Sequence, residues 1–100
     1  MNYAYRTTAQ STTVHANDRI IGVDTSSAPV TVSLPLASLF RQGFVLIIKD
    51  AGGNANNNNI TITPVSPSTI DLKTSIALSS DYASVTLVSV GSGTQLWSVV

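Results

Sequence analysis

The sequence predicts an all-β domain, either an antiparallel β-sandwich or a barrel-like arrangement of about eight short strands. Val and Ile together supply 19 of the 100 residues, and Ser and Thr supply 26, a composition typical of strands. In several segments apolar residues alternate with polar ones, as on a strand with one buried face. Clusters of Gly, Pro, Asn and Ser interrupt these segments about every 8–12 residues, which favours a sandwich or barrel.

We divide the chain into a polar, Thr-rich segment at residues 1–17 and a single β domain at residues 18–100. One hundred residues suffice for about one small core. Tyr3, Tyr5 and Val14 are the main apolar residues of the first segment. We expect it to form an edge strand, or an arm that becomes ordered only on a partner.

The first predicted strands lie on either side of a turn at residues 25–29. Residues 19–24 form a short apolar run, and residues 30–34 alternate so that Val30, Val32 and Leu34 share one face. Pro35 ends this strand because proline cannot donate to a β-ladder. Residues 36–40 have a hint of helical spacing, enough for about one or two turns.

Two stretches lack a polar face, at residues 44–49 and 82–90. Such runs are typical of strands that are covered on both sides. One cover would be the core, and we expect a partner subunit to provide the other.

The remaining segments predict loops and hairpins. Residues 50–59, rich in Gly and Asn, predict a long exposed hairpin loop followed by an alternating strand at 60–64. Residues 69–78 predict a short hairpin with Lys73 and Thr74 at its tip. Residues 94–100 predict a last strand that carries Trp97.

Composition excludes several classes of partner. Five basic residues balance five acidic ones, and only 10% of the chain is charged, so the basic patch that nucleic-acid binding needs is missing. The chain has no Cys, hence no disulfide or thiolate metal site. Its longest apolar runs are far shorter than the roughly 20 residues of a membrane span, and the first residues lack the apolar region of a secretory signal. We therefore expect neither a nucleic-acid nor a membrane partner.

We expect no catalytic residues. His15 is the one histidine, with Ser11 and Asp18 nearby in sequence, but such neighbours are common in a chain with 14 serines. We interpret it as a surface or interface histidine and the chain as a non-enzyme. A glycosidase needs a pair of carboxylates. The predicted turns account for most of the acids, because a turn Asp hydrogen-bonds its own backbone; the acidic residues are Asp18, Asp24, Asp50, Asp71 and Asp81.

We also expect no metal or cofactor site. Asp50 and Asn54 offer oxygen ligands for Ca²⁺, but no second carboxylate accompanies them. Residues 50–54 lack the Lys-Ser/Thr pair and the following helix of a phosphate-binding loop. A sugar platform is one role for exposed aromatic rings, but we interpret the largest rings as core residues; the rings in question are Phe40, Phe44, Tyr82 and Trp97.

An ordered series of motifs runs through residues 18–100, each of them common strand and turn chemistry. The motifs are DRIIGVDT (18–25), VTVSLP (30–35), IKDAGGNA (48–55), NITITP (59–64), TID (69–71), YASVTLVS (82–89) and WSVV (97–100). In this order they resemble a module that recurs in tailed-bacteriophage virion proteins, notably head-decoration proteins and tail-fibre tips. Two features depart from the family. Leu72 follows the Ile-Asp pair where Gly is frequent, and the turn before Trp97 is longer, at residues 93–96.

The resemblance implies an all-β, trimeric virion component. We expect a capsid decoration (cement) protein that forms an intertwined or tightly packed homotrimer, binds the major capsid protein and stabilises the head. It would be made in the host cytoplasm and reside on the capsid surface. The short, near-neutral chain fits this role, since it would pack on a shell without strong repulsion. Residues 1–17 are the candidate for the capsid contact or for strand exchange between subunits.

The alternative is a tail-fibre or tail-tip module that recognises a host surface glycan or protein. A chain of this size would then need another protein to carry it.

Overall fold

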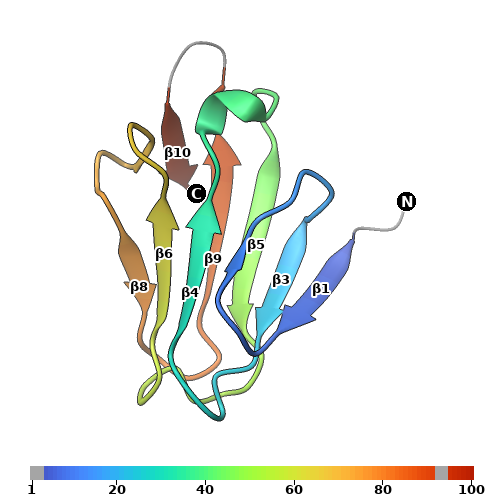
Figure 1. Cartoon of the computed structure of the whole chain (residues 1–100), viewed down its shortest axis with the longest axis vertical. Coiled ribbons are helices and arrows are strands. Elements are labelled where there is room, and N and C mark those ends of the chain that lie inside the picture. The colour runs from blue at the N-terminus through green and yellow to red at the C-terminus, as the bar shows by residue number, and fades with distance from the viewer. Residues whose placement is uncertain (1–3, 92–94) are drawn as a thin grey trace.

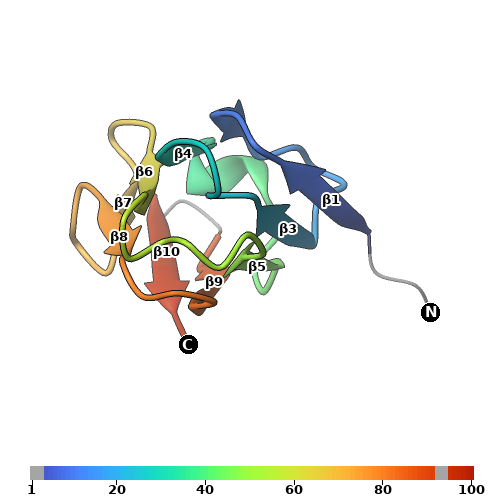
Figure 2. The same cartoon turned by 90° about the horizontal axis from the view of Figure 1, so that it is seen from below.

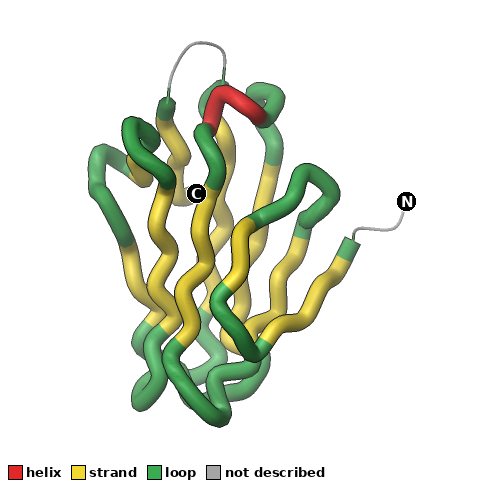
Figure 3. The backbone as a smooth tube through the Cα atoms, in the orientation of Figure 1, coloured by secondary structure: helices red, strands yellow, loops and turns green. Residues whose placement is uncertain are grey.

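A computed structural model of the chain describes residues 4–91 and 95–100, which form two β-sheets packed face to face (Figure 1). Seen from below, β4 and β6 lie on one side and β5, β9 and β10 on the other (Figure 2). One 3₁₀ turn, η1 (Ala37–Leu39), is the only helical element in these ranges, as Figure 3 shows. The strands are β1 (Tyr5–Thr8), β2 (Thr12–Thr13), β3 (Ile20–Val23), β4 (Val30–Leu34), β5 (Val45–Asp50), β6 (Ile60–Pro64), β7 (Thr69–Ile70), β8 (Ile76–Leu78), β9 (Ser84–Ser89) and β10 (Leu96–Val99).

The chain changes sheet at each of its first eight strands. The six-stranded sheet has the order β1-β3-β5-β9-β10-β7, and the four-stranded sheet has the order β2-β4-β6-β8. Because the chain crosses the sandwich between successive strands, it returns to each sheet in the same direction. The strands β1, β3 and β5 are therefore parallel, as are β2, β4 and β6.

The all-β prediction is confirmed, and the prediction of an antiparallel arrangement is wrong because both sheets are mixed. Among the named strands of the described residues, antiparallel pairs are β5 with β9, β9 with β10 and β6 with β8. Alternation along a strand reveals which side chains share a face, but it carries no information about strand direction.

Two predicted hairpins are wrong for the same reason. Residues 69–78 contribute β7 to the six-stranded sheet and β8 to the four-stranded sheet, so they do not pair as one hairpin. Residues 51–59 cross from β5 to β6 between the sheets rather than joining two neighbouring strands. Tyr3, and residues 93 and 94 of the lengthened turn, lie outside the described residues.

The core fills the space between the two sheets. Val30, Val32 and Leu34 are buried on one face of β4, as the alternation predicts. Trp97 is fully buried, and its Nε1–H donates to the carbonyl oxygen of Pro35 at 3.3 Å. Ring centroids of Phe40 and Phe44 lie 5.2 and 6.4 Å from that of Trp97, which confirms the core interpretation of these three aromatic residues.

One chain closes its own core. Its accessible surface of 5388 Å² matches the roughly 5,400 Å² typical of a compact monomer of this mass. No strand from a second copy is needed to cover the interior of the sandwich.

Candidate functional site

Asp18 is bound by an arginine from the N-terminal segment. Its carboxylate accepts hydrogen bonds from Nε and Nη2 of Arg6, at 3.0 and 2.9 Å, and from the backbone N–H of His15 at 2.8 Å. Burial alone would raise the pKa of Asp18, but these hydrogen bonds outweigh it and hold the pKa below its ordinary value. Asp18 is therefore occupied by the guanidinium and an amide, and its partner at His15 is the backbone rather than the imidazole.

The same arginine ties the two sheets together at their N-terminal edge. Arg6 lies on β1 of the six-stranded sheet, and it also donates to the Thr12 hydroxyl at 2.9 Å and to the Thr13 carbonyl at 3.3 Å on β2. Residues 5–8 pair in parallel with β3. The described part of the N-terminal segment is thus held against the sandwich as edge strands.

Asp50 organises the crossing from β5 to β6. Its fully buried carboxylate accepts four hydrogen bonds. The donors are the Thr25 hydroxyl at 2.7 Å and the backbone N–H groups of Tyr82, Gly53 and Ala55 at 2.9, 3.1 and 3.1 Å. Burial alone would raise the pKa of Asp50, yet these donors lower it below the ordinary value.

This arrangement gives Asp50 a structural role in its loop. The Asn54 side-chain oxygen accepts a hydrogen bond from Nδ2 of Asn57 at 3.3 Å. The backbone N–H of Asn54 donates to the Thr25 hydroxyl. No cluster of three or more His, Cys, Asp or Glu residues occurs in ranges 4–91 and 95–100.

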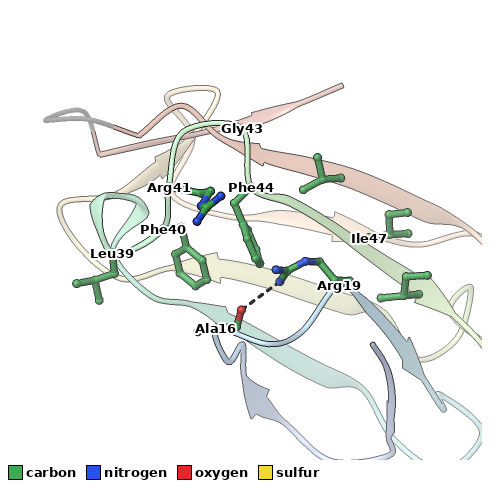
Figure 4. Close-up of a pocket in the computed structure, with 10 residues that line it drawn as sticks. Ala16, Arg19, Leu39, Phe40, Arg41, Gly43, Phe44 and Ile47 are labelled. Carbon is green, nitrogen blue, oxygen red and sulfur yellow. Dashed lines mark hydrogen bonds between the residues drawn. The ribbon is translucent and has the colours of Figure 1, made fainter. Parts of the chain in front are cut away.

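An open depression of about 810 Å³ lies where β3 and β5 begin, beside η1 (Figure 4). Phe40 and Phe44, both less than 9% exposed, contribute aromatic carbon to it. Leu39, 72% exposed, stands at its rim. The depression is therefore mainly apolar.

Two arginines give the depression a positive charge. The Arg19 guanidinium lies 4.4 Å from the Phe44 ring centroid, and its Nη1 donates to the carbonyl oxygens of Ala16 and Asp18 at 3.1 and 2.9 Å. The exposed Arg41 side chain makes no ion pair or hydrogen bond within the described residues. In Figure 4 the Phe44 ring is drawn between these two guanidinium groups. None of the described residues that line the depression carries a carboxylate, so its positive charge is available to an anionic group.

The depression continues onto the outer side of the six-stranded sheet, where four apolar side chains form an apolar outer face. Strand register places Ile20 opposite Ile47, and Val45 opposite Val88. Their chain neighbours Ile21, Leu46, Ile48 and Leu87 are buried in the core, so the four point outward. Val45 is 42% exposed and the other three are half-buried.

The outward-facing residues of the four-stranded sheet are polar, in contrast to those of the six-stranded sheet. There the register pairs Thr31 with Thr61 and Ser33 with Thr63. All four are half-buried, between the buried residues of their strands. The two outer surfaces of the sandwich therefore differ in kind.

The sequence located this apolar outer face only in part. The unbroken apolar run at residues 44–48, in the strand predicted at 44–49, predicted a second cover, and the single chain leaves that side of β5 open. Arg19 and Arg41 were not singled out, because they come together only through the parallel pairing of β3 with β5.

Tyr82 is the exposed member of the four aromatic residues considered for a sugar platform. It is 61% exposed and lies over Gly53, with the Lys49 ammonium 5.4 Å from its ring centroid. Phe40, Phe44 and Trp97 are buried elsewhere, so the four rings do not form a shared platform.

Comparison with models of protein families finds no match, and a search of curated proteins finds no similar sequence. Within the described ranges, no helix has the length and apolar character to cross a membrane.

Proposed function

We propose that the chain is a structural protein of a tailed-bacteriophage virion, a head-decoration protein that assembles as a homotrimer on the major capsid protein. The observation that carries this proposal is the apolar outer face with its adjoining depression. Contiguous apolar surface next to polar surface marks a site of protein association. The ordered motifs of residues 18–100, which resemble those of decoration and fibre-tip modules, support this class of assembly.

The mechanism is stabilisation by binding. A decoration trimer that contacts the assembled shell, but not its free subunits, favours the shell by mass action. About 800 Å² of buried surface per partner suffices for a stable contact. We place such contacts on the apolar outer face rather than on residues 4–17, because Arg6 and the pairing of β1 with β3 hold that segment in the fold.

The test is immunogold labelling of virions with an antibody against this chain. Gold spread over the head is expected. Gold restricted to the tail would contradict decoration, and absence of label from all particles would contradict a virion role.

A second test uses two matched lysine variants with purified heads that lack the chain. Ile47→Lys places a charge on the apolar outer face and should abolish decoration. Thr61→Lys places the same charge on the polar side of the other sheet and should leave decoration unchanged. Equal binding by both variants would remove the apolar outer face from the contact.

The second candidate is a tail-tip module that binds a host glycan, and one observation favours it. Arg19 and Arg41 flank an open depression that no carboxylate lines, a setting that suits an acidic sugar. Gold confined to the tail tip, together with sialylated or uronic-acid glycans that bind the wild-type chain but not Arg41→Glu, would establish this function instead.

A further inference from the structure

The turn after β7 has a backbone that its residues do not favour. Ile70 and Lys73 exchange backbone hydrogen bonds of 2.9 and 2.8 Å across the two residues between them. Asp71 and Leu72 both have positive φ, +48° and +67°. Positive φ at both central positions defines a type I′ turn, for which Asp-Gly and Asn-Gly are the usual sequences.

Leu72 takes the glycine position of this turn and gains no burial there. Its side chain is 85% exposed, more than any other large hydrophobic residue described. An L-residue with a Cβ is strained at this φ. A strained residue that contributes nothing to the core is a candidate for a role outside its own fold.

The turn and the depression lie on different sides of the molecule. β7 ends the six-stranded sheet, and β9 and β10 separate it from β5 and β3, which border the depression. In Figures 1 and 2 the orange connection between β7 and β8 lies at one side of the sandwich and β3 at the other. One chain cannot insert this turn into its own depression, but a second copy of the chain can offer its turn.

We propose that Leu72 of one copy inserts into the depression of the next, with Asp71 facing Arg19 and Arg41. This inference rests on the proposed function, because it specifies how the subunits of the decoration homotrimer meet. A contact between two different patches is head-to-tail, and it closes into a ring of three if each copy is rotated by 120°.

The chemistry of the two patches is complementary. The depression offers apolar walls and two guanidinium groups without a carboxylate, and the turn offers an exposed leucine beside a carboxylate. Each oxygen of Asp71 accepts one long hydrogen bond within its own chain, from the Ser98 hydroxyl at 3.2 Å and the Val99 N–H at 3.4 Å. Each oxygen therefore keeps capacity for a guanidinium donor. Lys73, exposed at the end of the turn, is the one charge there that the arginines would repel.

The test is sedimentation equilibrium on the full chain and on three variants. Leu72→Gly removes the inserted side chain and relieves the strained φ, so it should weaken self-association at least about tenfold while raising the thermal midpoint of the monomer. Arg41→Glu should weaken association to a similar degree without affecting the fold, since Arg41 is exposed. Lys73→Ala, the matched control within the same turn, should leave association unchanged or slightly stronger.

Mixing the two weakened variants tests the head-to-tail geometry. The Leu72→Gly chain keeps an intact depression, and the Arg41→Glu chain keeps an intact turn. Their mixture should form dimers with one native contact and no closed ring, at concentrations where neither weakened variant associates detectably alone.

Three results would overturn the inference: a wild-type chain that remains monomeric, association unaffected by Leu72→Gly, or a mixture that forms no dimer. A monomeric wild-type chain would also reject the proposed homotrimer, but none of these results would contradict decoration of the head, which the gold label tests independently. A head label with a monomeric chain would retain the function and reject this contact.

Discussion

The two outer surfaces of the sandwich have different chemistry although both belong to strands with buried inner faces. On the outer side of the four-stranded sheet, Thr31 lies opposite Thr61. The strands β4 and β6 alternate strictly between apolar and polar residues. On the six-stranded sheet, Ile47 lies between Ile20 and Thr86, and its strand is apolar on both sides. Strict alternation thus marks a face with a polar outer side, whereas an unbroken run leaves apolar surface on the outer side, which we propose binds another protein.

The two outer surfaces keep their different chemistry only while the sandwich is folded. Among the variants considered, replacement of Asp50 should destabilise the sandwich most. Asp50→Ala leaves four donors without their acceptor, two of them buried and two part-buried, which should cost about 3–5 kcal/mol of the free energy of unfolding. Urea denaturation monitored by Trp97 fluorescence measures the loss. Asp71→Ala, at an exposed carboxylate with two long contacts, is the control and should cost less than about 1 kcal/mol. Similar losses for the two variants would contradict the assigned role of Asp50.

Acid should also weaken the hydrogen bonds that the Asp50 carboxylate accepts. The loss of stability should be smaller than in Asp50→Ala, because a protonated carboxyl still accepts hydrogen bonds. The pKa of Asp50 is lower in the folded chain than its ordinary value. Its contribution to stability is therefore complete above the unfolded pKa of about 3.9 and is lost as the pH falls through the folded pKa. Denaturation curves from pH 6 to pH 2 should show a shallower loss for Asp50→Asn. The pKa of Asp18 is also lowered, so some acid sensitivity should remain.

Charging each outer face in turn sharpens the comparison directly. Ile47→Lys should weaken self-association or capsid binding by about 100-fold, because an unpaired ammonium would be buried in the contact. In the free monomer it should change the free energy of unfolding by only about 0.5 kcal/mol. Thr61→Lys should change neither quantity, as measured by sedimentation and urea denaturation. An equal effect of both lysines on assembly would mean that the chemical difference between the faces has no functional meaning.

Replacement of Arg6 tests whether its side-chain hydrogen bonds hold β1 and β2 together at the edge of the sandwich. Arg6→Met keeps most of the side-chain length but leaves Asp18 without its guanidinium, and should cost about 1–3 kcal/mol. Hydrogen exchange should then increase in β1 and β2 before the rest of the sandwich. Arg41→Met, at an exposed arginine that pairs with no carboxylate among the described residues, controls for the loss of positive charge. Unchanged exchange in β1 would mean that strand pairing alone holds the segment.

The smallest expected effect is a gain in stability. Leu72→Gly should stabilise the isolated domain by about 1 kcal/mol, because it removes the strain of a side chain at φ +67°. Leu72→Ala retains the Cβ and should give no such gain. Thermal unfolding at a concentration where the chain is monomeric separates the two variants. A destabilised glycine variant would show that Leu72 supports its own fold after all.

Short-range chemistry explains what could be predicted from the sequence. The alternation at residues 30–34 identified the buried face of β4, and the Gly- and Asn-rich residues after β5 identified a loop, which the Asp50 carboxylate at the end of β5 holds. Neither pattern indicates which strand will lie alongside. Sheet membership arises from how the chain crosses the sandwich, and with it the contact of Arg6 with Asp18 and the position of Arg19 and Arg41 around one depression. The left-handed conformation at Leu72 was also hidden, because leucine gives no turn signal. Its one sign was that the module that the sequence resembles frequently has glycine at this position.

The domain should fold slowly, because the chain alternates between the two sheets from β1 to β9. Of the described strand pairings, only β9 with β10 joins strands that are consecutive in the sequence. Every other pairing must close a loop that contains at least one strand of the opposite sheet, so chain entropy is lost before most of the contacts form. High contact order of this kind slows folding to about milliseconds to seconds. A nascent chain would therefore expose its unpaired strands until β9 and β10 arrive, and stopped-flow refolding should show a single slow phase that Leu72→Gly leaves nearly unchanged.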